Sequence, residues 1–151
     1  MLRISSLVLL LAPYAGAFQS TFDLHEVAWK MSPETSGESI HMEMTLNPLL
    51  NRESVIVRMP QWRPGSYRYA QYERDLSNLK VQDQEGKPRA IEEIDPRTWE
   101  INSAGATSLI VEYDLQVENE ANPGEIPAIH LHGPATFLYL EDSLNLSHTL
   151  Q

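Results

Sequence analysis

The 151-residue chain carries 21 Asp and Glu against 11 Lys and Arg, a formal net charge of −10, and no cysteine. This acidic balance argues against a nucleic-acid partner, because phosphates favour clustered Lys and Arg. The lack of cysteine excludes disulfides, thiol chemistry and thiolate metal sites. The fold must therefore be stabilised by ordinary apolar burial, for which one domain of this length is sufficient.

The first predicted element is a secretory signal peptide at residues 1–17. Arg3 precedes a short apolar run, and the small residues at 15–17 have the A-x-A pattern of a cleavage site. The apolar run is well below the roughly 20 residues that cross a bilayer. We expect a mature chain that begins at Phe18, is exported to a periplasm or the extracellular space, and has no membrane span after cleavage.

Alternating apolar and polar residues dominate the rest of the chain. Residues 39–48 (SIHMEMTLNP), 54–59 (SVIVRM) and 108–117 (SLIVEYDLQV) show the period of a strand with one buried face, and 136–140 (TFLYL) indicate another strand. The best helical candidate, residues 69–79 (YAQYERDLSNL), is short and equally compatible with an irregular strand.

Turn signals rich in Gly, Pro, Asn and Asp separate these segments at short spacing. The pattern predicts an all-β fold, an antiparallel β-sandwich of about seven to nine short strands with little helix. We place this domain at residues 18–142 and expect a polar C-terminal tail at residues 143–151.

The loop after residues 54–58 is unusually rigid and aromatic: residues 59–76 read MPQWRPGSYRYAQYERDL. Pro60 and Pro64 fix backbone angles and remove amide donors, which excludes a central strand or a helix interior. Pro64-Gly65 fits the middle of a type II turn. The stiff loop holds Trp62 and Tyr67 either for packing over the end of the sandwich or for contact with a partner.

Two histidine motifs suggest metal binding without completing a site. Residues 25–29 (HEVAW) begin like an H-E-x-x-H zinc motif, but Trp29 stands where the second histidine is needed. His130 and His132 lie two apart, so a strand would point both to one face. They are weak metal candidates because no third ligand is identifiable, and a solvated strand face is the simpler interpretation. We predict no cofactor.

Four motifs follow one another between residues 59 and 101: a P-x-W-x-P-G-S-Y segment, an aromatic stretch that ends in an arginine, a D-x-x-G-K-P turn and a D-x-x-T-W strand. Their residues are Pro60, Trp62, Pro64, Gly65, Ser66, Tyr67, Tyr72, Arg74, Asp83, Gly86, Lys87, Pro88, Asp95, Thr98 and Trp99. These motifs resemble the N-terminal domain of the glycyl aminopeptidases, metallopeptidase family sixty-one. The likeness extends over roughly residues 20–142.

The resemblance implies a β-sandwich that precedes a thermolysin-like catalytic domain and a PDZ domain. The family's zinc ligands belong to the catalytic domain, and none of them can be carried over to this sequence. Residues 143–151 do not look like the family's continuation. By analogy the aromatic loop is a candidate for lining the cleft, through Trp62, Arg63, Gly65, Ser66 and Tyr67.

The leading hypothesis is a non-catalytic exported domain, the accessory N-terminal part of a zinc aminopeptidase, present as a fragment or a stand-alone module. Its expected partner is a zinc peptidase catalytic domain or a peptide. The alternative is an independent extracellular module that binds a peptide or a carbohydrate. In that case Trp62, Tyr67, Tyr69 and Tyr72 would form the binding surface.

Overall fold

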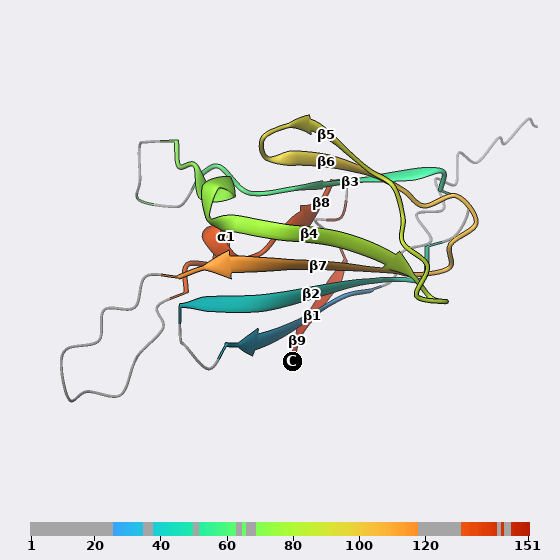
Figure 1. Cartoon of the computed structure of the whole chain (residues 1–151), viewed down its shortest axis with the longest axis horizontal. Helices are drawn as coiled ribbons and strands as arrows, with labels where there is room; N and C mark the ends of the chain where they lie inside the picture. The colour runs from blue at the N-terminus through green and yellow to red at the C-terminus, as the bar shows by residue number, and fades with distance from the viewer. Residues whose placement is uncertain are drawn as a thin grey trace, which may run out of the picture.

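The structure of the chain is a computed structural model that describes residues 26–34, 38–49, 52–62, 65, 69–117, 131–141, 143 and 146–151. These residues form two β-sheets that face each other (Figure 1). The all-β sandwich predicted from the sequence is confirmed, with nine strands among the described residues. The predicted signal peptide at 1–17, and also Arg63, Ser66, Tyr67 and His130, lie outside the described residues.

The larger sheet has five strands in the spatial order β4–β7–β2–β1–β9. Its strands are β4 (Leu76–Asp83), β7 (Leu109–Gln116), β2 (Ser39–Asn47), β1 (Glu26–Pro33) and β9 (Ser147–Leu150). Neighbouring strands run antiparallel, except that β9 pairs with β1 in parallel.

The smaller sheet has four antiparallel strands in the order β5–β6–β3–β8. Its strands are β5 (Ile91–Asp95), β6 (Thr98–Asn102), β3 (Ser54–Arg58) and β8 (Tyr139–Leu140). A 3-10 helix, η1 (Tyr72–Asp75), and a four-residue α-helix, α1 (Gly133–Thr136), complete the described elements. No helix in the described part of the chain is long and apolar enough to cross a membrane.

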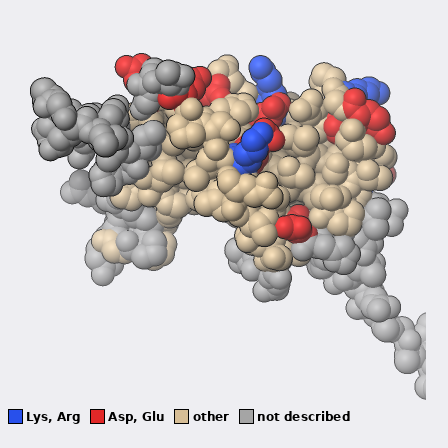
Figure 2. Space-filling view, turned by 90° about the horizontal axis from the view of Figure 1, so that it is seen from below, with Lys and Arg blue, Asp and Glu red and all other residues tan. Residues whose placement is uncertain are grey.

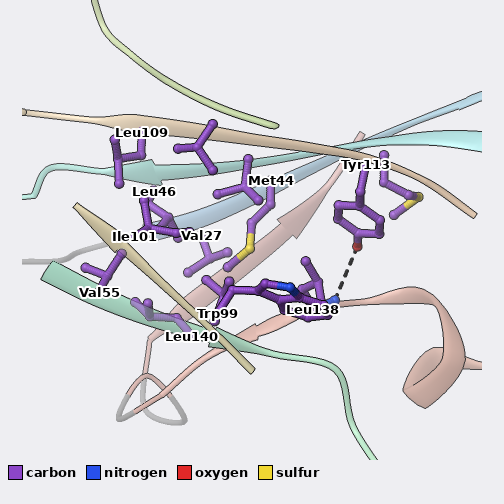
Figure 3. Packing of buried hydrophobic residues seen from close by; sticks show 14 of the residues in the cluster. Val27, Met44, Leu46, Val55, Trp99, Ile101, Leu109, Tyr113, Leu138 and Leu140 are labelled. Carbon is purple, nitrogen blue, oxygen red and sulfur yellow. Dashed lines mark hydrogen bonds between the residues drawn. The ribbon is translucent and has the colours of Figure 1, made fainter. Parts of the chain in front are cut away.

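Alternation along the strands decides which side chains enter the core. In β2 and β7 every second residue is buried between the sheets, and the residues between them face outward. The register pairs Met44 with Val111 and Met42 with Tyr113, so buried residues lie opposite buried residues. Trp99 and Ile101 on β6 contribute from the opposite sheet (Figure 3). The core is therefore the one that the sequence alternation predicts.

Three local predictions differ from the structure. The expected polar tail includes strand β9, whose backbone continues the larger sheet beside β1. The helical candidate divides into η1 and the start of β4. In residues 136–140 only Tyr139 and Leu140 form a strand, because α1 occupies the chain up to Thr136.

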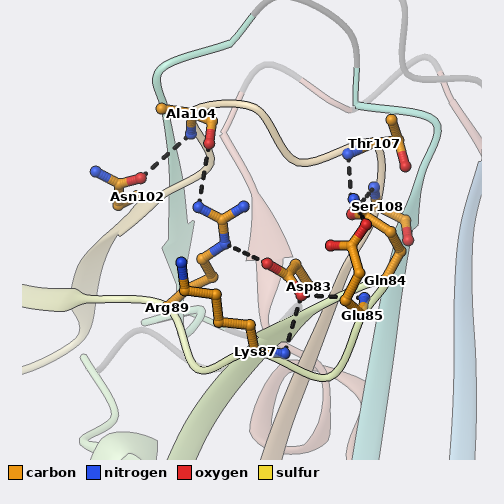
Figure 4. Close-up of polar contacts among 9 residues, drawn as sticks. All are labelled: Asp83, Gln84, Glu85, Lys87, Arg89, Asn102, Ala104, Thr107 and Ser108. Carbon is orange, nitrogen blue, oxygen red and sulfur yellow. Dashed lines mark hydrogen bonds and ion pairs between the residues drawn. The ribbon is translucent and has the colours of Figure 1, made fainter.

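A buried carboxylate organises the corner between β4 and β5 (Figure 4). The backbone amides of Glu85 and Lys87 donate to Asp83 Oδ1 at 3.0 and 2.9 Å, and Arg89 Nε lies 3.0 Å from Asp83 Oδ2 as an ion pair. Gly86 sits in this turn with φ of 75°, a conformation that favours glycine. The D-x-x-G-K-P motif thus forms a turn closed by its own aspartate.

Candidate functional site

The aromatic loop after β3 is closed at its base. Ala70 N–H donates to the carbonyl of Gln61 at 3.0 Å, which brings the two ends of the segment together. Gly65 has φ of 83°, as the predicted turn requires. Trp62 is 54% exposed and Tyr69 is 81% exposed. Trp62 therefore does not seal the sandwich, which was one of the two interpretations of the loop.

The two flanks of the loop are anchored in the core. Met59 is fully buried, and its backbone amide donates to the carbonyl of Arg97 at 2.9 Å. Tyr72, in η1, is partly buried and packs against the core cluster. Arg74 in the same helix is exposed. The loop thus leaves and re-enters the sandwich at fixed points and presents Trp62 and Tyr69 to solvent.

An apolar groove of about 600 Å³ lies where the sandwich is open, between the edge strands β8 and β9. It is lined by Trp29, Pro60, Gly133, Pro134, Phe137, Leu138, Tyr139, His148, Thr149 and Leu150. Each sheet ends at this side with a short strand, so neither edge covers the apolar side chains between them. Figure 2, viewed from the side on which β1 and β9 lie in Figure 1, shows a described surface that is mostly uncharged, with some Lys, Arg, Asp and Glu side chains near its middle and at its edges.

The wall of the groove is built around two aromatic rings. Trp29 on β1 and Phe137 after α1 meet edge to face, with ring centroids 5.1 Å apart and planes at 72°. Leu150 at the rim is 56% exposed, although it is apolar. Pro60 brings the aromatic loop to this groove, so the loop and the groove belong to one continuous region.

Tyr113 fixes the α1 segment that forms one side of the groove. Its hydroxyl donates to the carbonyl of Thr136 at 2.8 Å and accepts the Leu138 amide at 3.2 Å (Figure 3). Burial raises the pKa of Tyr113 well above its usual range, so the hydroxyl stays protonated. Its part in the structure is to position the backbone.

His132 is exposed at the start of α1, where its carbonyl accepts the Thr136 hydroxyl at 3.0 Å. Among the described residues, the group of His, Asp or Glu side chains that comes within metal-binding reach is His41, Glu43 and Glu112, and His132 is not part of it. In the part of the chain that the structure describes, His132 therefore belongs to no group of three or more possible metal ligands.

Sequence reasoning missed the groove. In the sequence alone, Trp29 only breaks a zinc motif, and Leu150 only belongs to a segment expected to be a polar tail. The alternation of Val27 and Trp29 does signal a buried face on β1. No local pattern, however, indicates that β9 returns to lie beside it, because the two strands are far apart in the chain: Thr149 donates a hydrogen bond to Glu26, a residue 123 positions away.

Comparison with known protein families shows which family the chain belongs to. Residues 31–151 match the family described as Peptidase M61 N-terminal domain. The chain belongs to this family. The match reaches residue 151 and so includes β9, which corrects the expectation that residues 143–151 depart from the family.

Solved structures agree on the fold of this M61 N-terminal domain. A crystal structure of an aminopeptidase N family protein from Idiomarina loihiensis matches with a TM-score of 0.67 and 17% sequence identity. The match covers 83% of this chain and 22% of that protein, so the chain spans less than a quarter of its solved relative. No protein with a curated description matches the chain.

Proposed function

We propose that the chain is the non-catalytic, exported N-terminal domain of an M61-type zinc aminopeptidase, present as a fragment or as a stand-alone module. The observation that carries the proposal is the family match over residues 31–151, which is a match to the N-terminal domain alone. The sequence also holds no H-E-x-x-H motif in its 151 residues. The comparisons give no support to an independent peptide- or carbohydrate-binding module.

The groove between β8 and β9 is the surface that we assign to the catalytic partner. It is apolar, it is bordered by exposed Leu150, and it adjoins the exposed Trp62 loop. The solved relative has most of its chain outside the matched segment, so a domain of this type has a large neighbour to pack against. A partner that covers the groove gains free energy of about 25 cal/mol for each Å² of apolar surface that it removes from water.

The size of the native protein tests whether the chain works inside a larger peptidase. An antibody raised against the chain should detect either the isolated protein, at or below 17.2 kDa, or a several-fold larger one. In the larger species, mass spectrometry should find a peptide with the H-E-x-x-H motif. A larger species without any such motif would contradict the proposal.

The groove is tested in that assembly by Leu150→Glu, with Leu131→Glu as the matched control. Both leucines are exposed, but Leu131 does not line the groove. We expect Leu150→Glu to weaken the association or to lower aminopeptidase activity, because a carboxylate would be buried in an apolar contact. Equal behaviour of the two variants would show that the partner does not occupy the groove.

Export has its own test. The N-terminus of the protein recovered from the periplasm or the medium should be Phe18. Recovery of the chain with Met1 intact in the soluble interior of the cell would contradict the proposal of export.

A further inference from the structure

The outward face of the five-stranded sheet carries a compact polar cluster that the proposed function does not use. His41 and Glu43 lie on β2, and Asp114 and Glu112 lie directly opposite them on β7. Since side chains two residues apart on a strand share one face, all four project to the same side of the sheet. We infer that His41, Glu43 and Glu112 form a binding site for a divalent transition-metal ion of the zinc type.

The spacing of the three ligand atoms suits one ion. The imidazole nitrogen and the two carboxylate oxygens all lie within 4.8 Å of one another. His41 Nε2 is 3.8 Å from Glu112 Oε1, which is too long for a hydrogen bond. Two donors on one tetrahedral zinc, at bond lengths of about 2.0–2.2 Å, are separated by roughly 3.4 Å. The distance from His41 to Glu112 exceeds this separation by about 0.4 Å, and the widest of the three distances exceeds it by at most about 1.4 Å. Rotation of the partly exposed ends of the glutamate side chains has to close a gap of this size.

Asp114 lies outside the three ligands and orients the imidazole. Its Oδ1 is 2.7 Å from His41 Nδ1, and its Oδ2 accepts a hydrogen bond from Asn78 at 2.7 Å. A carboxylate only accepts hydrogen bonds, so Nδ1 carries a proton and Nε2 is the ring nitrogen that is left to bind an ion. Metal-ligating histidines almost always donate the other ring N–H to a carboxylate, a backbone carbonyl or a water, and Asp114 is in the position to accept it here.

The charges around the cluster explain why a cation is favourable there. Glu43 and Glu112 face each other directly across the β2–β7 pair, and like charges in that position destabilise a sheet. Lys30 and Lys80 lie on the outer side of this pair, opposite Glu43 and Glu112 respectively, and not between them. An ion bound by both carboxylates neutralises the repulsion where it arises.

Lys30 competes with a metal ion for the carboxylate of Glu43. Its Nζ is 2.9 Å from Glu43 Oε2, but the side chain is 56% exposed, and such surface ion pairs contribute about 0–1 kcal/mol. A metal ion can therefore displace it. The mixture of one imidazole and two carboxylates favours zinc over calcium or magnesium, which prefer all-oxygen ligands.

Isothermal titration of the full chain with zinc chloride, after removal of trace metal, tests the site. We expect one zinc per chain, loss of that binding in His41→Ala, and roughly tenfold weaker binding in Asp114→Asn, which perturbs only the orienting residue. Lys30→Gln should bind more tightly, because the competing cation is removed. His132→Ala is the matched control and should bind as the unmodified chain does.

Thermal unfolding of each variant without metal shows that it is folded, and added zinc should raise the melting temperature of the unmodified chain but not of His41→Ala. Absence of stoichiometric zinc binding would overturn the inference. So would binding that survives in His41→Ala, is lost in His132→Ala, or is matched by calcium. These titrations need no peptidase activity, so their outcome is independent of the proposed function.

Discussion

Tyr113 shows how a single residue connects the sequence pattern to the groove. It is fully buried on β7, and its hydroxyl bonds both the carbonyl of Thr136 and the amide of Leu138. The alternation of residues 108–117 predicts that its ring is buried. The hydrogen bonds could not be predicted, because the two backbone groups lie more than 20 residues away, in a segment with no regular pattern.

Replacing Tyr113 by Phe leaves these two backbone groups without their partner. We expect the free energy of unfolding to fall by about 1–3 kcal/mol, the usual cost of a buried polar group left unsatisfied. Urea unfolding measures the change, and Tyr69→Phe is the control because Tyr69 is exposed. A loss for Tyr113→Phe no larger than that of the control would show that the hydroxyl does not hold the α1 segment.

The ionisation of Asp83 should make the free energy of unfolding depend on pH in the acid range. Burial alone would raise the pKa of this carboxyl, but hydrogen bonds from the amides of Lys87 and Glu85, together with the Arg89 guanidinium, hold the pKa below its usual value of 3.8. Because the pKa is lower in the folded state, the contribution is fully present above about pH 4 and is lost as the pH falls through the folded-state pKa.

The measurement is unfolding by urea at a series of pH values from about 6 downward. In Asp83→Asn the free energy of unfolding should be lower near neutral pH and should depend less on pH below about 4 than in the unmodified chain. Glu34→Gln, at an exposed position, is the control. Identical pH profiles for the unmodified chain and Asp83→Asn would contradict this account of the turn.

At the scale of elements, the long strands could be predicted and the short ones could not. Alternating apolar and polar residues predict β2, β3 and β7, because each of these strands has one face that is buried along its whole length. β8 has two residues, and all four residues of β9 are exposed, so neither shows a period. The candidate groove lies between these two strands, which is why sequence reasoning found the loop beside it and not the groove.

The same reasoning applies to the polar cluster on the sheet. The alternation of residues 39–48 places His41 and Glu43 on the outer face. Their proximity to Glu112 depends on the β2–β7 register, which a sequence pattern does not determine because the two strands are far apart in the chain. The pair His130 and His132 drew attention only because its members are neighbours in sequence.

Neighbouring positions on β7 test the assigned faces directly. Val111 is fully buried, whereas Ile110 is half-buried on the outer side. Val111→Asp should prevent folding, since an unpaired buried charge costs several kcal/mol. Ile110→Asp should fold and lose about 1 kcal/mol. Circular dichroism and urea unfolding distinguish them, and a reversed order would mean that the strand presents its other face to the core.

At the scale of the whole molecule, the described residues form a sandwich with its own apolar core, and the 151-residue sequence contains no H-E-x-x-H motif. Twenty apolar residues are buried in the part of the chain that the structure describes, enough for this domain to hold together without a disulfide. Fold and family could both be recognised from the sequence, through strand alternation and the Trp-Pro-Gly-Ser-Tyr loop. The groove could not, because it is formed by the edge strands β8 and β9, which only the three-dimensional structure brings together.

The most direct test of the central claim is the hydrolysis of aminoacyl arylamides by the purified chain, with added zinc and with a chelator. A metal-dependent aminopeptidase of known activity serves as the positive control. We predict no chelator-sensitive turnover under any of these conditions, while the chain itself unfolds cooperatively. Hydrolysis that zinc supports and the chelator abolishes would contradict the account.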